Sequence, residues 1–199
     1  MRLAVLISGR GSNLQALIDA CAQDEFPASV VLVVSNNPDA QGLARAEAAG
    51  IPTATVERRD YDSRDAFDEA LSQTISAHDA DLVCLAGFMS ILGKKFVSRR
   101  HGRLINIHPS LLPAYPGLDT HARALADGVS TAGCTVHFVT AEIDAGPIII
   151  QETVPIEPND TAETLAARVL TTEHRIYPQA VRLIAEERSR SSTGREVPG

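Results

Sequence analysis

Leu3-Ala4-Val5-Leu6-Ile7-Ser8-Gly9-Arg10-Gly11-Ser12-Asn13 is the stretch from which the fold of this chain is best predicted. Its first five residues form an unbroken apolar run of strand length, and the glycine- and serine-rich residues after them are typical of a loop. A segment with helical periodicity, residues 14–22, follows. Because an apolar run without alternation indicates a strand buried on both faces, this unit predicts a strand-loop-helix element of a parallel sheet.

The same alternation continues through the first half of the chain, with strands predicted at residues 30–34, 51–56, 81–86 and 104–108 and helices at 42–49 and 62–77. Strands separated by helices predict an α/β fold with a parallel sheet covered on both faces. The second half predicts a helix at 118–127, strands at 135–139 and 147–154, and a long helix at 160–185.

The long C-terminal helix carries two sequence signals. Asp160, with Glu163 three residues later, predicts a capping box at its start. Pro178 predicts a kink or a break near Tyr177. Residues 187–199 have no apolar period, so we expect one domain over residues 1–186 and a disordered tail after it.

Composition narrows the class of protein. The 199 residues carry 18 Lys+Arg against 25 Asp+Glu, a formal net charge of −7, and 44% are hydrophobic. This balance disfavours a broad nucleic-acid surface, and no apolar run reaches the roughly 20 residues of a membrane span. Three distant cysteines without a CxxC pair predict reduced structural thiols and no metal site. A cytoplasmic protein is therefore expected.

The loop Gly9-Arg10-Gly11-Ser12-Asn13 lies between a strand and a helix, where open α/β sheets bind ligands. Unpaired N–H groups and the helix dipole favour an anion there. The loop lacks the third glycine of GxGxxG and the Gly-Lys-Ser/Thr of a P-loop. Two interpretations stay open on this segment alone: a phosphomonoester site, or a turn with an N-cap serine.

The strand end Asn106-Ile107-His108-Pro109 is the most informative polar segment. Residues two apart on a strand share a face, and Pro109 keeps His108 extended. An amide that can bind an oxyanion next to an imidazole that can carry a proton suits acyl-group chemistry. The alternative is a buried Asn–His pair that satisfies loop backbone.

Asp144 lies in a turn between two predicted strands, so it is either an acid-base partner that favours protonated His108 or an Asx turn before Gly146-Pro147. The other histidines give weaker signals. We expect His121 to begin a helix, His137 to lie in a strand, His78 and His101 to lie on the surface, and His174 to pack or lie on a helix surface.

Four motifs together resemble one family. They are Ile7-Ser8-Gly9-x-Gly11-Ser12-Asn13-Leu14, Leu85-Ala86-Gly87-Phe88-Met89, Asn106-Ile107-His108-Pro109-Ser110-Leu111-Leu112-Pro113, and Gly133-Cys134-Thr135-Val136-His137-Phe138-Val139 leading to Asp144-x-Gly146. In this order, over residues 1–185, the chain resembles the folate-dependent phosphoribosylglycinamide formyltransferases, also called glycinamide ribonucleotide transformylases.

The resemblance implies a single-domain formyltransferase fold, α/β and Rossmann-like, with a mostly parallel twisted sheet, helices on both faces and an antiparallel C-terminal extension. It implies transfer of the formyl group of 10-formyltetrahydrofolate to the amine of 5-phosphoribosylglycinamide in purine biosynthesis. It also implies small-molecule substrates, no metal, and a monomer or homodimer. The catalytic residues it implies are Asn106, His108 and Asp144.

Matching positions imply two binding sites as well. The ribonucleotide site comprises Gly11, Ser12, Asn13, Gly87, Met89, Pro109 and Glu173. The folate site comprises Arg64, Phe88, Met89, Ser90, Ile91, Leu92, Val97, Leu104, Asn106, Val139, Thr140, Ala141, Glu142, Ile143 and Asp144.

Simpler structural roles remain open for several of these residues. Glu173 is otherwise a solvated helix residue, and Arg64 otherwise pairs with a nearby aspartate, Asp62, Asp65 or Asp68. For Met89, Ile91, Leu92 and Val97 the alternative is ordinary core. The chain also departs from the family pattern, with Ser90 at a position that is commonly arginine and Asp119 at one that is frequently basic or neutral.

Three other functions compete with this prediction. Methionyl-tRNA formyltransferase shares the Asn-x-His-Pro-Ser-Leu-Leu-Pro pattern but needs a further domain and a basic tRNA surface. Formyltetrahydrofolate hydrolase shares it too, usually behind an N-terminal regulatory domain. An inactive module that binds a phosphometabolite or folate is the alternative from another class, and the intact Asn106, His108 and Asp144 argue against it.

Overall fold

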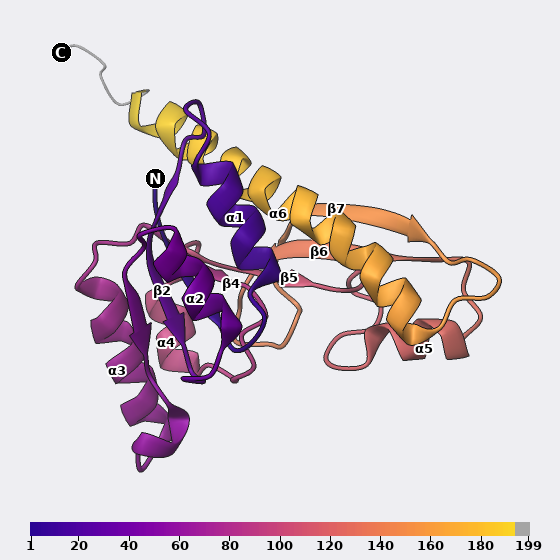
Figure 1. Ribbon diagram of the computed structural model, residues 1–199, viewed down its shortest axis with the longest axis horizontal. Coiled ribbons are helices and arrows are strands. Elements are labelled where there is room, and N and C mark those ends of the chain that lie inside the picture. Colours follow the sequence, from indigo (N-terminus) through magenta and orange to yellow (C-terminus); the bar gives the residue numbers. More distant parts are fainter. Residues whose placement is uncertain (194–199) are drawn as a thin grey trace.

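The computed structural model describes residues 1–193, with the side chains of residues 1–191, and shows one sheet flanked by helices (Figure 1). Within this range the strands are β1 (Arg2–Ile7), β2 (Ser29–Ser35), β3 (Thr53–Thr55), β4 (Leu82–Leu85), β5 (Leu104–His108), β6 (Thr131–Phe138) and β7 (Ile148–Pro155). The helices are α1 (Ser12–Cys21), α2 (Gln41–Ala48), the 3-10 turn η1 (Arg58–Asp60), α3 (Arg64–Ser76), α4 (Lys94–Arg99), α5 (Thr120–Ala126) and α6 (Ala162–Thr193).

The strand order in the sheet is β3-β2-β1-β4-β5-β6-β7. β3, β2, β1, β4 and β5 pair in parallel, whereas β6 and β7 add antiparallel. This confirms the expected mixed α/β sheet. Because the chain runs outward from β1 to one edge and then returns to β4, the switch point lies between β1 and β4. Open α/β sheets bind ligands beyond the carboxyl ends of the strands at such a point.

β1 shows why its apolar run does not alternate. Leu3, Val5 and Ile7 enter the core on one face of the sheet, and Ala4 and Leu6 enter the core on the other face. All five are fully buried. A strand with helices on both sides has no solvent face, so every position is apolar.

The helices divide between the two faces of the sheet. Side chains of α1, α2 and α6 form one core layer, and those of α3 and α4 form the other. In Figure 1, α6 runs beside α1 and across β6 and β7, so the last helix ties the parallel half of the sheet to its antiparallel half. None of the helices in residues 1–193 has the length and apolar composition that a membrane span requires.

The start of α6 differs from the predicted capping box. Thr161 Oγ1 accepts the N–H of Thr164, and Thr164 Oγ1 accepts the N–H of Thr161. Asp160 instead forms a two-pronged ion pair with Arg168. The cap therefore lies one residue later, at Thr161.

Pro178 lies inside α6, and the predicted break near Tyr177 does not occur. Proline inside a helix costs about 3 kcal/mol or more. Tyr177, Ala180 and Val181 are fully buried beside it, and the Tyr177 hydroxyl donates to the Leu85 carbonyl at 2.9 Å. Packing on both sides of the proline offsets the lost backbone hydrogen bond.

Residues 187–193 continue α6, so the predicted disordered tail is wrong for them. The Arg188 guanidinium donates to the carbonyls of Asp81 and Gly102, which attaches this last part of the helix to the body of the protein. The remainder of the predicted tail, residues 194–199, lies outside the described residues. The short helix α4 was not predicted, since six residues beginning with two lysines show no apolar stripe.

Candidate active site

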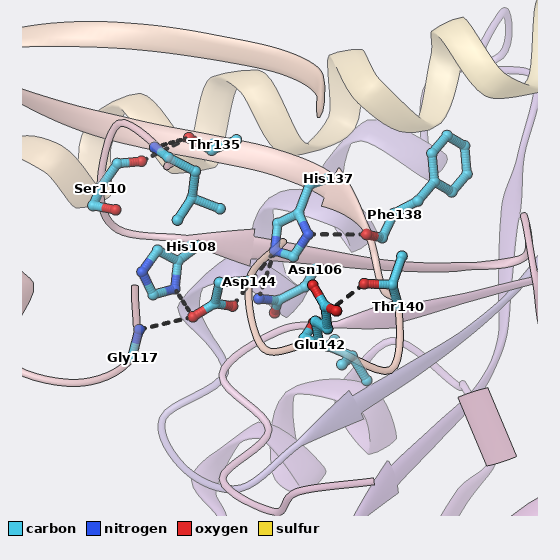
Figure 2. A network of polar contacts seen from close by, with 12 residues as sticks. Asn106, His108, Ser110, Gly117, Thr135, His137, Phe138, Thr140, Glu142 and Asp144 are labelled. Atoms are coloured by element: carbon cyan, nitrogen blue, oxygen red, sulfur yellow. Dashed lines mark hydrogen bonds and ion pairs between the residues drawn. The ribbon is translucent and has the colours of Figure 1, made fainter. Parts of the chain in front are cut away.

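The polar strand end of β5 lies against β6, and the antiparallel register decides which residues meet. Asn106 pairs with His137, and His108 pairs with Thr135. Directly opposed residues project from the same face of a sheet, so these four side chains lie together. Figure 2 shows them at the carboxyl end of β5. Asn106 and His108 thus share a face, as predicted, and His137 and Thr135 of β6 lie on the same face.

Asp144 brings a carboxylate to this group from the loop that joins β6 and β7. Its Oδ2 lies 3.4 Å from His108 Nδ1 and accepts the N–H of Gly117 at 2.9 Å, and its Oδ1 lies 3.6 Å from His137 Nε2 (Figure 2). The backbone is left-handed here, with φ at 52°, a conformation that aspartate tolerates better than most residues. The side chain therefore faces the histidines, and the Asx-turn interpretation is wrong.

His108 is buried, and an oxygen acceptor faces each of its ring nitrogens. Nε2 lies 3.0 Å from the carbonyl oxygen of Tyr115, and Nδ1 faces Asp144. A doubly protonated ring donates to both acceptors, whereas a neutral ring leaves one nitrogen facing an oxygen without a hydrogen. The two acceptors hold the His108 ring in one orientation.

His137 belongs to this site although no local pattern in the sequence predicts it. Its Nδ1 lies 3.0 Å from the carbonyl of Phe138, and its Nε2 lies 3.3 Å from Asn106 Nδ2. Burial lowers the pKa of His137, so the ring is neutral near pH 7. With the hydrogen on Nδ1, Nε2 accepts from the Asn106 amide. The nearest signal is the spacing Thr135-x-His137, which repeats the polar spacing of Asn106-x-His108 on a second strand.

Thr135 anchors the loop that follows β5. Its hydroxyl donates to the Ser110 carbonyl at 2.6 Å and accepts from Leu112 N–H and from Gln151 Nε2. The same loop supplies the Tyr115 carbonyl that holds His108. Buried hydrogen bonds of this kind keep the loop backbone in one position.

The glycine loop lies at the carboxyl end of β1, as predicted. Gly11 has φ at 70°, and a Cβ on it would lie 2.6 Å from the Cα of Gly42. Gly11 is the N-cap of α1 and no side chain caps this helix, so the interpretation of Ser12 as an N-cap serine is wrong. Ser12 and Asn13 form the first turn, whose N–H groups favour an anion.

Asn13 and Glu173 meet although 160 residues separate them. Asn13 Nδ2 donates to Glu173 Oε2 at 2.6 Å, and both side chains are buried. Burial raises the pKa of Glu173, while the Asn13 hydrogen bond opposes that rise. Asn13 Oδ1 is buried without a partner among residues 1–191. Glu173 is therefore not a solvated helix residue, and the pair adjoins the glycine loop.

Gly87 and Met89 lie beside that loop, after β4. The Ser8 N–H donates to the Gly87 carbonyl, and the Met89 N–H donates to Ser8 Oγ at 2.6 Å. These bonds join the loops that follow β1 and β4. Pro109, which follows His108, is half-buried.

The apolar residues predicted around a folate divide into two groups. Met89 and Ile91 are 72% and 59% exposed, so for them the ordinary-core interpretation is wrong. Val97 is buried in the core between the sheet and α3, where ordinary packing accounts for it. Of the other predicted folate residues, Leu104 is fully buried in that core, and Phe88, Leu92 and Val139 are partly buried against it.

Arg64 opens α3 and is exposed. It forms no ion pair within 4 Å among the described side chains, and Asp65 pairs with Lys95 instead. The interpretation of Arg64 as a partner of a neighbouring aspartate is therefore wrong. Ser90, at the departure from the family pattern, is half-buried, and Asp119 is the left-handed N-cap of α5.

The loop from Val139 to Asp144 lies beside the polar side chains of Asn106, His108 and His137 in Figure 2. Thr140 Oγ1 donates to the carbonyl of Glu142, and Ala141, Glu142 and Ile143 are exposed. Gly146 ends the turn against the Phe138 carbonyl, where a Cβ has no room. This tight return is what carries Asp144 back toward β5.

The cysteines give no nucleophile. Cys21, Cys84 and Cys134 form no disulfide, and burial raises the pKa of Cys21 to about 11 and that of Cys134 to about 12. The thiolate is the reactive form of cysteine, and it is disfavoured here. Within residues 1–191 no group of three or more histidine, cysteine, aspartate or glutamate side chains is placed to hold a metal ion.

An amide, a carboxylate and two histidines at the carboxyl edge of a mostly parallel sheet are groups that can supply acid-base and oxyanion chemistry, as an α/β group-transfer enzyme requires. Comparison with known proteins identifies the family. The formyl transferase family model matches residues 1–181, and the chain belongs to that family.

Several relatives are similar over nearly the whole chain. Phosphoribosylglycinamide formyltransferase of Escherichia coli (strain K12) is 51% identical over 188 residues, which are 94% of this chain and 89% of that protein. Glycinamide ribonucleotide transformylase 1 from Symbiobacterium toebii has a crystal structure that superposes with a TM-score of 0.92 at 50% identity, covering 94% of this chain and 89% of that one. The trifunctional purine biosynthetic protein adenosine-3 of Bos taurus is 50% identical over 92% of this chain, but the chain spans only 18% of its length.

Proposed function

We propose that this chain transfers the formyl group of 10-formyltetrahydrofolate to the amine of 5-phosphoribosylglycinamide, giving tetrahydrofolate and formylated 5-phosphoribosylglycinamide for purine biosynthesis. The observation that carries the proposal is the single polar group in which Asp144 faces His108 and His137, and His137 contacts Asn106, in a chain of the formyl transferase family. Relatives named phosphoribosylglycinamide formyltransferase that match nearly the whole chain support the choice of substrates.

The proposed step is direct attack by the neutral amine nitrogen on the formyl carbon. A C–N bond forms to the acceptor, and the carbonyl oxygen becomes an oxyanion. One amide hydrogen of Asn106 donates to His137, and the other is free to donate to that oxyanion. No residue needs to form a covalent bond with the formyl group.

Collapse of the tetrahedral intermediate breaks the bond to the folate nitrogen. His108, held by Asp144 and the Tyr115 carbonyl, supplies a proton to that nitrogen or to the oxyanion. The acceptor amine loses one proton, which a water held by Asp144 passes to His108, so the site returns to its starting charge. Each such group typically contributes about 10²–10⁴-fold to the rate.

The acceptor site in this proposal lies at the start of α1. The N–H groups of its first turn and the Ser12 hydroxyl bind the phosphate, since a helix N-terminus favours an anion. The buried pair of Asn13 and Glu173 contacts the ribonucleotide, and the raised pKa of Glu173 suits a hydrogen bond to sugar hydroxyls. Gly87, Met89 and Pro109 complete the proposed site.

The donor site in this proposal lies between Arg64, the segment after β4 and the segment before Asp144. Exposed Met89, Ile91 and Ile143 provide apolar walls for a pterin, and Arg64 is available for an anionic group of the folate. The full set also includes Phe88, Ser90, Leu92, Val97, Leu104, Asn106, Val139, Thr140, Ala141, Glu142 and Asp144. Cysteines without disulfides fit the proposed location in the cytoplasm.

Deformylation of 10-formyltetrahydrofolate, followed by absorbance with and without 5-phosphoribosylglycinamide, tests the proposal. Turnover is expected to depend on the acceptor, and formylated acceptor should appear in equal amount to tetrahydrofolate. Equal turnover without the acceptor would show a hydrolase instead.

Three variants test the assignment of the catalytic group. Asn106→Ala, His108→Ala and Asp144→Ala are each expected to lower kcat by about 10²–10⁴-fold with folding retained. Asp24→Ala, at an exposed position in the turn after α1, is the matched control and is expected to leave kcat unchanged. Near-wild-type rates in all three variants contradict the assignment.

A further inference from the structure

The segment 88–92 between β4 and α4 has few apolar contacts to hold it. Met89 and Ile91 are largely exposed, and only Phe88 and Leu92 pack partly against the core. Its position therefore depends on the hydrogen bonds at its two ends. At the first end, Met89 N–H donates to Ser8 Oγ, and that hydroxyl donates to Asn36 Oδ1.

At the second end the anchor is Asp68 of α3. Asp68 Oδ2 accepts the N–H of Gly93 at 2.7 Å, and the carbonyl of Gly93 accepts the N–H of Val97 to begin α4. One carboxylate oxygen thus determines where segment 88–92 ends and where the next helix starts.

Asp68 is an unusual residue for its place on α3. It is only 5% exposed and lies on the buried face with Phe67, Leu71 and Ile75. Its Oδ1 is buried without a hydrogen-bond partner among the described side chains. Burial raises the pKa of Asp68, and the Gly93 N–H and the charge of Arg64 oppose that rise. A buried carboxyl costs free energy that an apolar residue would not, so its contact with Gly93 needs an explanation beyond packing.

Gly93 and Asp68 are shaped to fit each other. A Cβ on Gly93 would lie 2.5 Å from Asp68 Oδ2 and 3.8 Å from the side chain of Arg64. Any larger residue would push the carboxylate off the backbone N–H. Asp68 therefore lies between Arg64, one helical turn earlier on α3, and the end of segment 88–92. Both of these belong to the proposed donor site.

We infer that Asp68 is a positioning residue for the formyl donor. By accepting the Gly93 N–H, it fixes segment 88–92 relative to Arg64, so that the residues proposed to contact the folate are in position before it binds. The inference rests on the proposed function, because the donor site is part of that proposal. Asp68 acts through the segment and does not touch the reacting atoms.

The test is steady-state kinetics of Asp68→Ala, with each substrate varied in turn and the donor dissociation constant measured by calorimetry without acceptor. Losing the anchor is expected to raise the donor KM and dissociation constant about tenfold, the effect of one hydrogen bond to a charged group. The acceptor KM and kcat at saturating donor are expected to stay within threefold. Asp68→Asn keeps an oxygen acceptor for Gly93 and is expected to restore most of the donor affinity.

Asp65→Ala is the matched control, because Asp65 lies on the same helix, carries the same charge and pairs with exposed Lys95 of α4. Its donor KM is expected to match that of the wild type. An unchanged donor KM in folded Asp68→Ala, or equal rises in both KM values, overturns the inference. Wild-type protein without acceptor-dependent transfer overturns the proposed function instead, so the two failures are distinguishable.

Discussion

Asn106 has two amide hydrogens, and the structure gives one of them a fixed partner in His137 Nε2. An asparagine that donates to an oxyanion must keep its amide in one orientation, since its oxygen would repel the developing charge. The neutral His137 ring, held by the Phe138 carbonyl, is what selects that orientation. The role of His137 in the site is thus to orient the Asn106 amide.

His137→Phe tests whether His137 orients the Asn106 amide, because phenylalanine retains a ring but removes the acceptor. The Asn106 amide is then free to rotate, so kcat for formyl transfer is expected to fall at least tenfold while both KM values change little. The measurement is initial-rate kinetics, with circular dichroism to verify folding. His101→Phe, at an exposed position, is the control. A kcat for His137→Phe equal to that of the control would mean that His137 only fills space.

At the scale of the element, the unit β1-loop-α1 depends on close contact between the backbone of its glycine loop and the backbone of α2. The Gly42 N–H donates to the Gly9 carbonyl, and a Cβ on Gly42 would lie 2.4 Å from Ile7. Gly11 lies against the same glycine, so the start of α1 is held against α2 without an intervening side chain. This contact sets the position of the N–H groups proposed to bind the phosphate.

Gly11→Ala is expected to damage both the stability and the acceptor site. Alanine at a φ of 70° costs about 1 kcal/mol, and the collision with Gly42 adds to that. We expect a lower melting temperature and an acceptor KM raised at least tenfold, with the donor KM little changed. Gly9→Ala is the control, because no atom lies within 4 Å of a Cβ there. Equal acceptor KM values for the two variants would contradict this account.

At the scale of the whole molecule, folding shields three histidines on three different elements from solvent, one of them completely and two in part. Burial lowers the pKa of His121 on α5, His137 on β6 and His174 on α6. Two of them, His121 and His174, have a buried Nε2 without a partner among the described side chains. In the unfolded chain each ring titrates near pH 6.5.

The pH dependence of stability follows from these histidines. Their contribution is complete above pH 6.5 and is lost as the pH falls from 6.5 through the lowered native values, because the unfolded chain takes up protons that the native state excludes. Each contributes a slope of up to about 1.4 kcal/mol per pH unit. Urea unfolding at pH 8 and pH 6 should show a lower free energy of unfolding at pH 6. His174→Gln is expected to reduce that difference, and His101→Gln is not; a difference that His174→Gln leaves intact would contradict this explanation.

Most of the order of strands and helices was determined by the sequence alone, because apolar runs and helical periods are local properties. Leu3–Ile7 was recognisable since a strand covered on both faces has no polar position. In Leu104–His108 the apolar residues indicated a buried strand, and Asn106 and His108 were recognisable as a pair because two polar residues, two positions apart, end it.

Contacts between distant segments were decided only by the tertiary structure. No local pattern places His137 opposite Asn106, since that follows from the β5–β6 register. The meeting of Asn13 with Glu173 depends on how α6 crosses α1, and the burial of Asp68 depends on where Gly93 returns to α3. α4 and residues 187–193 form helices with little local signal, because backbone and side-chain partners outside them supply the stabilisation. The sequence thus determined which chemical groups this protein has, and packing decided which of them meet.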